Sequence, residues 1–143
     1  MPDKPIRIIL DTNIWISLLI TKDYEKFDPI LFSGKVVLIF SEELLSEFVT
    51  VAQRPKFRKY FTQTDLEELI EVIDESAEFI KVRSAVTACR DAKDNFLLSL
   101  AVDGKADYLI SGDNDLLELN PFGQTHIITI TEFLSIVNKT ELR

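Results

Sequence analysis

Short apolar runs of strand length alternate along the chain with longer stretches of helical periodicity. Ile6–Leu10 and Val36–Phe40 are nearly continuous apolar runs. Such runs are typical of strands that are buried on both faces of a parallel sheet. The same criteria predict three further strands, over residues 79–82, 107–111 and 126–130.

Helices are predicted between these strands. Ser41 is placed to cap the helix that follows the second strand, and that helix must stop before Pro55 because the residue before a proline disfavours the α conformation. Residues 64–67, Thr-Asp-Leu-Glu, have the spacing of a capping box, and apolar residues follow them at helical period. The predicted helices are residues 12–22, a segment from Ser41 to about Gln53, a segment from Thr64, residues 91–103 before Gly104, and a last segment capped by Thr131.

The order of these elements predicts an α/β fold. Strands that alternate with helices form parallel sheets with helices on both faces. We therefore expect a three-layer α/β/α sandwich around a mostly parallel sheet of about five strands. The 143 residues show no linker or internal repeat, so residues 1–143 are expected to form a single domain.

Composition narrows the class of protein. Apolar residues make up 46% of the chain, and the apolar stretch from Ile14 to Ile20 is far shorter than the roughly 20 residues of a membrane-spanning helix. No signal-peptide pattern opens the chain, so a soluble cytoplasmic protein is expected. The single Cys89 and single His126 exclude an internal disulfide and a two-histidine metal site. The net charge of −8 disfavours passive binding to nucleic acid but is compatible with an acidic metal site.

Four carboxylates are predicted to meet at one edge of the sheet. Asp11 and Asp113 follow the first and fourth strands, at the edge where parallel sheets bind their ligands. Asp94 lies in the first turn of its predicted helix and heads the apolar stripe of that helix. Glu47 lies on the border of the apolar face of the helix that begins after the second strand.

Such a cluster requires protonation or bound cations. Two carboxylates about 4 Å apart repel by roughly 4 kcal/mol at an effective dielectric constant of about 20. Oxygen ligands without histidine or cysteine select hard ions such as Mg²⁺ or Mn²⁺. Mg²⁺ is commonly held by a few carboxylates together with a substrate phosphate, so the pattern favours phosphodiester chemistry.

Each acid also has an ordinary structural interpretation. Asp11 suits a helix cap, and Asp94 suits the positive end of a helix dipole. Glu47 suits a solvated helix face, and Asp113 suits a polar turn. These interpretations become the weaker account when all four acids are expected at the same edge.

Four segments of the chain carry a resemblance to a known family. In their order and spacing they resemble the PIN domain, a small α/β nuclease fold, and in particular the branch of toxin components of prokaryotic toxin–antitoxin systems. The resemblance covers essentially the whole chain. The segments are residues 8–13 (IILDTN), 41–48 (SEELLSEF), 90–98 (RDAKDNFLL) and 107–113 (DYLISGD).

The resemblance implies roles for these residues. An acidic quartet would bind Mg²⁺ or Mn²⁺, with Asp115 as an alternative to the fourth acid and an additional candidate metal ligand. Polar residues beside it would hold the carboxylates by hydrogen bonds. The implied activity is metal-assisted endonucleolytic hydrolysis of single-stranded RNA. A homodimer and a cognate antitoxin protein are the implied partners. The quartet is Asp11, Glu47, Asp94 and Asp113, and the supporting residues are Asn13, Ser111 and Asp91.

One basic run could bind the RNA. Residues 54–61, RPKFRKYF, combine four cations with three aromatic rings, which is the combination that single-strand binding uses. A solvated loop with rings in the core is the equally weighted alternative. The candidate RNA-binding residues are Arg54, Lys56, Arg58 and Lys59.

Three other functions fit parts of this pattern. A non-catalytic PIN-fold module for RNA binding or assembly is the main alternative, and the complete set of acids argues against it. A receiver-like phosphoacceptor would need an acid pair just after the first strand and a lysine late in the chain. A phosphatase with Asp11 as nucleophile would need a second aspartate two residues later, where Asn13 stands.

Overall fold

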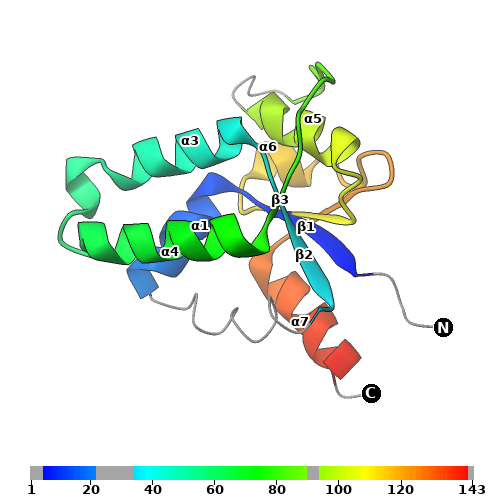
Figure 1. Cartoon of the computed structure of the whole chain (residues 1–143). Coiled ribbons are helices and arrows are strands. Elements are labelled where there is room, and N and C mark those ends of the chain that lie inside the picture. Colours follow the sequence, from blue (N-terminus) through cyan, green and yellow to red (C-terminus); the bar gives the residue numbers. More distant parts are fainter. Residues whose placement is uncertain (1–4, 22–33, 90–93, 142–143) are drawn as a thin grey trace.

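A five-stranded, all-parallel sheet forms the centre of the molecule (Figure 1). The computed structural model describes residues 5–21, 34–89 and 94–141. The strand order is β3-β2-β1-β4-β5, so the predicted α/β class and parallel sheet are confirmed. The strands are β1 (Ile6–Leu10), β2 (Val36–Phe40), β3 (Glu78–Phe79), β4 (Tyr108–Ile110) and β5 (His126–Ile128).

The first strand occupies the middle of the sheet. Ile8 pairs with Leu38 of β2 on one side and with Tyr108 of β4 on the other. Ile8 and Ile9 are completely buried, because helices cover both faces of this strand. The continuous apolar run that predicted a doubly buried strand therefore marks the central strand of the sheet.

The helices cover both faces of the sheet (Figure 1). The chain moves from β1 through β2 to β3, and then returns past β1 to β4 and β5. Right-handed crossovers therefore place α1, α3 and α4 on one face and α5 and α6 on the other, which gives three layers. The helices are α1 (Thr12–Thr21), α3 (Glu42–Ala52), the 3₁₀ helix η1 (Pro55–Phe57), α4 (Gln63–Ser76), α5 (Asn95–Asp103), α6 (Asn114–Leu117) and α7 (Ile130–Glu141). None of the helices in the described part of the chain has the length and apolarity needed to cross a membrane.

Two predicted helix caps are wrong by two residues. Helix α4 is capped by Thr62, which forms a reciprocal capping box with Asp65, rather than by Thr64. The Thr129 hydroxyl accepts a hydrogen bond from the Glu132 amide at the start of α7, so Thr131 is not the cap. At the start of α7 only Thr129 has an acid three residues later, which favours it as the cap. At the start of α4 both Thr62 and Thr64 have one, so the spacing alone does not distinguish them.

The later strands are shorter than predicted, and the short helices η1 and α6 were not predicted. The segment after β3 leaves the sheet, and Asp103 Oδ2 accepts hydrogen bonds from the amides of Arg83 and Ser84 at 2.6 and 2.8 Å. The short helix α6 follows β4 directly and is capped by Asp113. Helix α5 begins at Asn95, and residues 90–93, where its start was predicted, lie outside the described residues.

Candidate functional site

The candidate site lies where the strand order reverses. The chain leaves β1 toward β2, while β4 lies on the opposite side of β1. Ligands of open α/β sheets bind at such a point, outside the carboxyl ends of the strands. Asp11 directly follows β1, and Ser111 and Asp113 follow β4, so these residues lie at this point.

Asp11 is a buried carboxylate. The residue is only 5% exposed, and its amide donates to the carbonyl of Ile110 at 3.0 Å. The hydroxyl of Ser111, which is completely buried, donates to Asp11 Oδ2 at 2.8 Å. The backbone amides of Asn13 and Thr12 lie close enough to the carboxylate to lower its pKa.

Burial raises the pKa of the Asp11 carboxyl above its ordinary value. The hydrogen bonds from Ser111, Asn13 and Thr12 lower the pKa and oppose this effect, while the negative charge of Asp113 raises it further. Desolvation dominates, so the site holds a carboxylate whose negative charge is incompletely compensated by the protein.

Glu47 contributes a second carboxylate from helix α3. Partial burial raises its pKa, and the neighbouring charge of Asp11 raises it further. The Thr12 hydroxyl and the more distant Arg54 lower it. The Thr12 hydroxyl is buried and has no hydrogen bond of normal distance and angle among the described residues, so we attribute its effect on Glu47 to a longer, weaker approach. The carboxylates of Asp11 and Glu47 therefore repel each other, and Thr12 lies beside Glu47.

Asp113 is linked to Asp11 through Ser111. The Asp113 amide donates to Ser111 Oγ at 3.0 Å, while the same hydroxyl donates to Asp11. Asp113 Oδ1 also accepts from the amide of Asp115 at 2.9 Å and caps α6. Asp113 therefore does form the polar turn that its ordinary interpretation expected. The same turn brings its carboxylate close enough to raise the pKa of Asp11.

Asp94 lies at the N-cap position of α5 and is partly buried. Its neighbour Asn95 accepts a hydrogen bond from the amide of Cys89 at 2.8 Å. The Cys89 thiol in turn lies 3.9 Å from the carbonyl oxygen of Asp115. These contacts connect the start of α5 to the start of α6. They bring the backbone at Asp94 to the edge of the sheet at which Asp113 lies.

Glu47 opens onto a shallow pocket between α3 and α5. Phe96, two residues after Asp94, is the α5 residue in its lining. This pocket is predominantly acidic, and it extends the candidate site along the first turns of α3. The lining residues are Glu42, Glu43, Ser46, Glu47 and Phe96.

Three further predicted residues differ in how they relate to these acids. Asn13 is exposed, and its backbone amide rather than its side chain is the group that lowers the pKa of Asp11. Asp91 lies outside the described residues. Arg54 lies at the end of α3, close enough to Glu47 to lower its pKa, and is the member of the basic run that approaches the acids.

The rest of the basic run is a surface loop. Lys56, Arg58 and Lys59 are exposed, whereas Phe61 is 8% exposed and packs into the core. The Lys59 ammonium lies 5.2 Å from the centre of the Tyr60 ring, and Tyr60 is 44% exposed. The run therefore divides, with its cations and Tyr60 in solvent and its last ring in the core.

The donor set fits a hard divalent cation. Its side chains offer only oxygen ligands, which such ions prefer. The charge of Asp113 raises the pKa of the buried Asp11, and the charge of Asp11 in turn raises the pKa of Glu47. Among residues 5–21, 34–89 and 94–141, no three histidine, cysteine, aspartate or glutamate side chains form a group already arranged to hold an ion. The carboxylates are therefore neighbours in pairs rather than a closed cage.

Thr12 and Arg54 were not predicted as members of the acidic site. Thr12 follows Asp11 in the sequence, but only the fold shows that its hydroxyl is buried beside Glu47. Arg54 lies just beyond the end of α3 in extended backbone, so helical spacing from Glu47 does not predict its approach and only the fold shows it.

Comparisons with known proteins place the chain in a family. A family model described as PIN domain matches residues 7–115. The chain is 30% identical over 117 residues to the uncharacterized protein MJ1680 of Methanocaldococcus jannaschii, covering 80% of this chain and 75% of that protein. The chain therefore belongs to the PIN domain family.

The fold agrees with a solved structure. PAE2754 from Pyrobaculum aerophilum superposes with a TM-score of 0.55 at 11% sequence identity, over 93% of this chain and 90% of that one. PIN domains are generally nucleases and typically bind divalent metals. The class of this protein is thus that of a nuclease-type α/β domain.

Proposed function

We propose that this protein is a Mg²⁺- or Mn²⁺-dependent endoribonuclease that hydrolyses phosphodiester bonds of single-stranded RNA. The observation that carries the proposal is the buried Asp11 carboxylate, whose pKa is raised by burial and by the charge of Asp113, with Glu47 nearby. Like charges that lie together away from water are unfavourable unless a group of opposite charge pairs with them. A divalent cation is the partner that these oxygen ligands favour.

Four acids would hold the metal. Asp113 is favoured over Asp115 as the fourth ligand, because it is Asp113 whose charge acts on Asp11. When bound, the metal lowers the pKa of a coordinated water and stabilises negative charge on the leaving oxygen. The proposed ligands are Asp11, Glu47, Asp94 and Asp113.

Protein groups around the acids would keep them in place. The Ser111 hydroxyl bonds Asp11 and accepts from the Asp113 amide, so one side chain sets the positions of two proposed ligands. Such outer contacts orient carboxylates and favour their ionised form. The buried Thr12 hydroxyl lies on the other side, toward Glu47.

The basic loop provides the RNA contacts in this proposal. Arg54 lies close enough to Glu47 to lower its pKa, and the exposed cations Lys56, Arg58 and Lys59 follow it in the sequence. A phosphate backbone bound along these side chains would enter the acidic site from the C-terminal end of α3. The positive charges of the loop offset locally the net charge of −8.

The decisive experiment compares RNA cleavage by the wild type and by Asp11→Asn. We expect cleavage of single-stranded RNA with Mg²⁺ or Mn²⁺, its loss in EDTA, and at least a hundredfold loss in the variant. Asp74→Asn, an exposed acid on α4, is the matched control and should cleave normally. Equal cleavage by wild type and Asp11→Asn would refute the proposal, and absence of cleavage with RNA binding intact would favour the non-catalytic module.

The toxin role, the homodimer and a cognate antitoxin are finer proposals that rest on the family resemblance. Expression of the chain alone should arrest growth of a host cell, and Asp11→Asn should relieve the arrest. Coexpression of the neighbouring small open reading frame should also relieve it and yield a complex on size-exclusion chromatography. Growth without arrest would contradict the toxin role and leave the nuclease proposal standing.

A further inference from the structure

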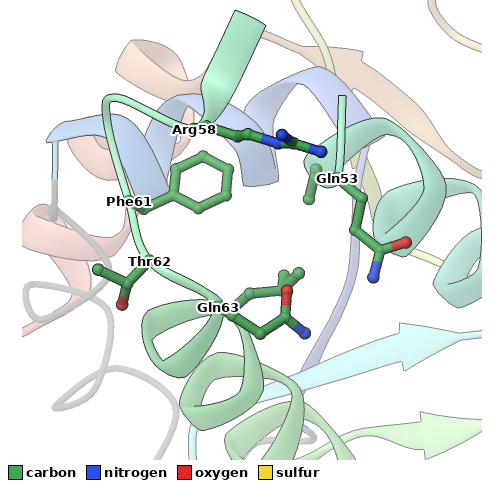
Figure 2. Close-up of a pocket in the computed structure, with 7 residues that line it drawn as sticks. Gln53, Arg58, Phe61, Thr62 and Gln63 are labelled. Atoms are coloured by element: carbon green, nitrogen blue, oxygen red, sulfur yellow. The ribbon is translucent and has the colours of Figure 1, made fainter. Parts of the chain in front are cut away.

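A second pocket lies at the end of the α3–α4 hairpin, away from the acids. Its volume is about 510 Å³, within the range of small-molecule sites. Figure 2 shows side chains from the end of α3, the following loop and the first turn of α4 placed around one opening. The lining residues are Ala52, Gln53, Arg58, Phe61, Thr62, Gln63 and Leu66.

The pocket has an apolar floor and a polar rim. Ala52, Phe61 and Leu66 are 4%, 8% and 1% exposed, so their side chains form a largely buried base. Gln53 and Arg58 are exposed at the rim, where Figure 2 shows them on neighbouring sides of the opening. An apolar base with a few convergent polar groups is the usual design of a ligand site.

The rim groups have donors and acceptors available for a ligand. Arg58 forms no ion pair within the described part of the chain. The Gln63 amide nitrogen lies 3.4 Å from Glu67 Oε1, a weak contact along the surface of α4 from which it can turn. Two of the three glutamines of the chain, Gln53 and Gln63, therefore present amides at the same opening.

These chemistries match the parts of a nucleotide. A guanidinium pairs with phosphate, and the flat face of a base packs on the apolar floor. A glutamine amide offers one donor and one acceptor, which matches the N6 and N7 edge of adenine. The exposed cations Lys56 and Lys59 on the same loop favour an anionic chain beyond the single phosphate.

We infer that this pocket binds one nucleotide unit of single-stranded RNA, with Arg58 on the phosphate and Gln53 and Gln63 on the edge of an adenine base. The pocket would act as a base-reading subsite at a fixed place relative to the acids, because α3 carries both Glu47 and Gln53. Its meaning for cleavage rests on the proposed nuclease function, whereas nucleotide binding itself does not require the metal.

The test measures binding of AMP and of ribose 5-phosphate to the full chain in EDTA by calorimetry. AMP should bind at least tenfold more tightly than ribose 5-phosphate, because the base contributes to binding. The double variant Gln53→Ala/Gln63→Ala should lose about tenfold in AMP affinity, as expected for two neutral hydrogen bonds, and keep its affinity for ribose 5-phosphate. Arg58→Gln should weaken both ligands.

Gln124→Ala is the matched control, since Gln124 is exposed in a turn outside the pocket. Equal affinity for AMP and ribose 5-phosphate, or unchanged AMP binding in the double variant, would overturn the inference. All substituted residues are exposed, and a thermal unfolding curve like that of the wild type establishes that each variant is folded. AMP binding by a chain that cuts no RNA would refute the nuclease proposal alone, and RNA cleavage without AMP binding would refute the pocket alone.

Discussion

The Ser111 hydroxyl donates a hydrogen bond of 2.8 Å to Asp11 Oδ2, joining residues that are 100 positions apart in the sequence. Ser111 is completely buried, and its oxygen also accepts from the Asp113 amide at 3.0 Å. A single side chain thus connects the carboxyl ends of the neighbouring strands β1 and β4. Through it, the pairing of β1 with β4 determines how the acids face one another.

Replacement of Ser111 by alanine should weaken metal binding. Loss of the hydroxyl removes a hydrogen bond that lowers the pKa of Asp11, so the ionised form becomes less favourable. We expect Mn²⁺ affinity, measured by calorimetry, to fall about 10- to 100-fold. Ser135→Ala on the exposed face of α7 is the control and should bind Mn²⁺ like the wild type. Unchanged affinity in Ser111→Ala would show that this contact serves the fold alone.

Asp11→Asn should stabilise the metal-free protein at neutral pH. The folded protein raises the pKa of this carboxyl above 3.8, so it binds the proton more tightly than the unfolded chain does. The stability that the protonated Asp11 contributes is therefore lost as the pH rises from 3.8 to the raised pKa. Above that interval the ionised carboxylate lowers the free energy of unfolding. Urea unfolding in EDTA should show the advantage of the variant at pH 7 and its decrease toward pH 4.

Added Mn²⁺ should reverse that order. A ligand that binds only the folded state raises the unfolding free energy, so the wild type should gain stability that Asp11→Asn does not. A wild type that is more stable than Asp11→Asn in EDTA at pH 7 would contradict the assignment of Asp11 as an undercompensated charge.

Thr12→Val should separate metal binding from stability. The Thr12 hydroxyl is buried and lies toward Glu47 without a well-formed hydrogen bond, so its removal costs the fold little. We expect a several-fold loss of Mn²⁺ affinity, with an unfolding free energy equal to or above that of the wild type. Thr12→Ser keeps the hydroxyl and should restore the affinity. Failure of serine to restore it would assign the effect to packing.

Charge reversal at Lys56 and Lys59 should weaken RNA binding. Each lost phosphate contact reduces the slope of log affinity against log salt by roughly 0.7 for a single strand. Filter binding of a single-stranded RNA in EDTA, at several salt concentrations, measures this slope. Lys105→Glu, an exposed cation in the turn before β4, is the control. A slope that stays the same in Lys56→Glu/Lys59→Glu would identify the run as a solvated loop.

Gly104→Ala should destabilise the fold. A Cβ atom at Gly104 would lie 2.8 Å from Ile39 Cγ2 and 2.9 Å from the Leu100 carbonyl oxygen, so α5 could not pack as closely on β2. We expect a loss of about 1–3 kcal/mol in the unfolding free energy, measured in urea. Gly112→Ala, where a Cβ would meet nothing within 4 Å, should lose much less. Equal effects of the two substitutions would contradict this packing argument.

The order of apolar runs and helical segments was sufficient to predict the fold class and the two longest strands. Ile6–Leu10 and Val36–Phe40 were predicted at their observed bounds, because a strand buried on both faces must be apolar throughout. Local signals were less decisive where alternatives lie two residues apart, as at Thr62 and Thr64, since either threonine satisfies the short pattern. The four candidate acids were also proposed from the sequence, through their places after strands and on helices and through the resemblance to PIN domains.

The tertiary structure alone decided which side chains surround those acids. Ser111 reaches Asp11 because β4 pairs with β1, and Thr12 is buried beside Glu47 because α3 packs on α1. The pocket with Gln53 and Gln63 exists because the loop after α3 turns the chain back into α4 (Figure 1). None of these contacts follows from residue spacing, since each depends on the order of strands and on helix packing, which are properties of the whole chain.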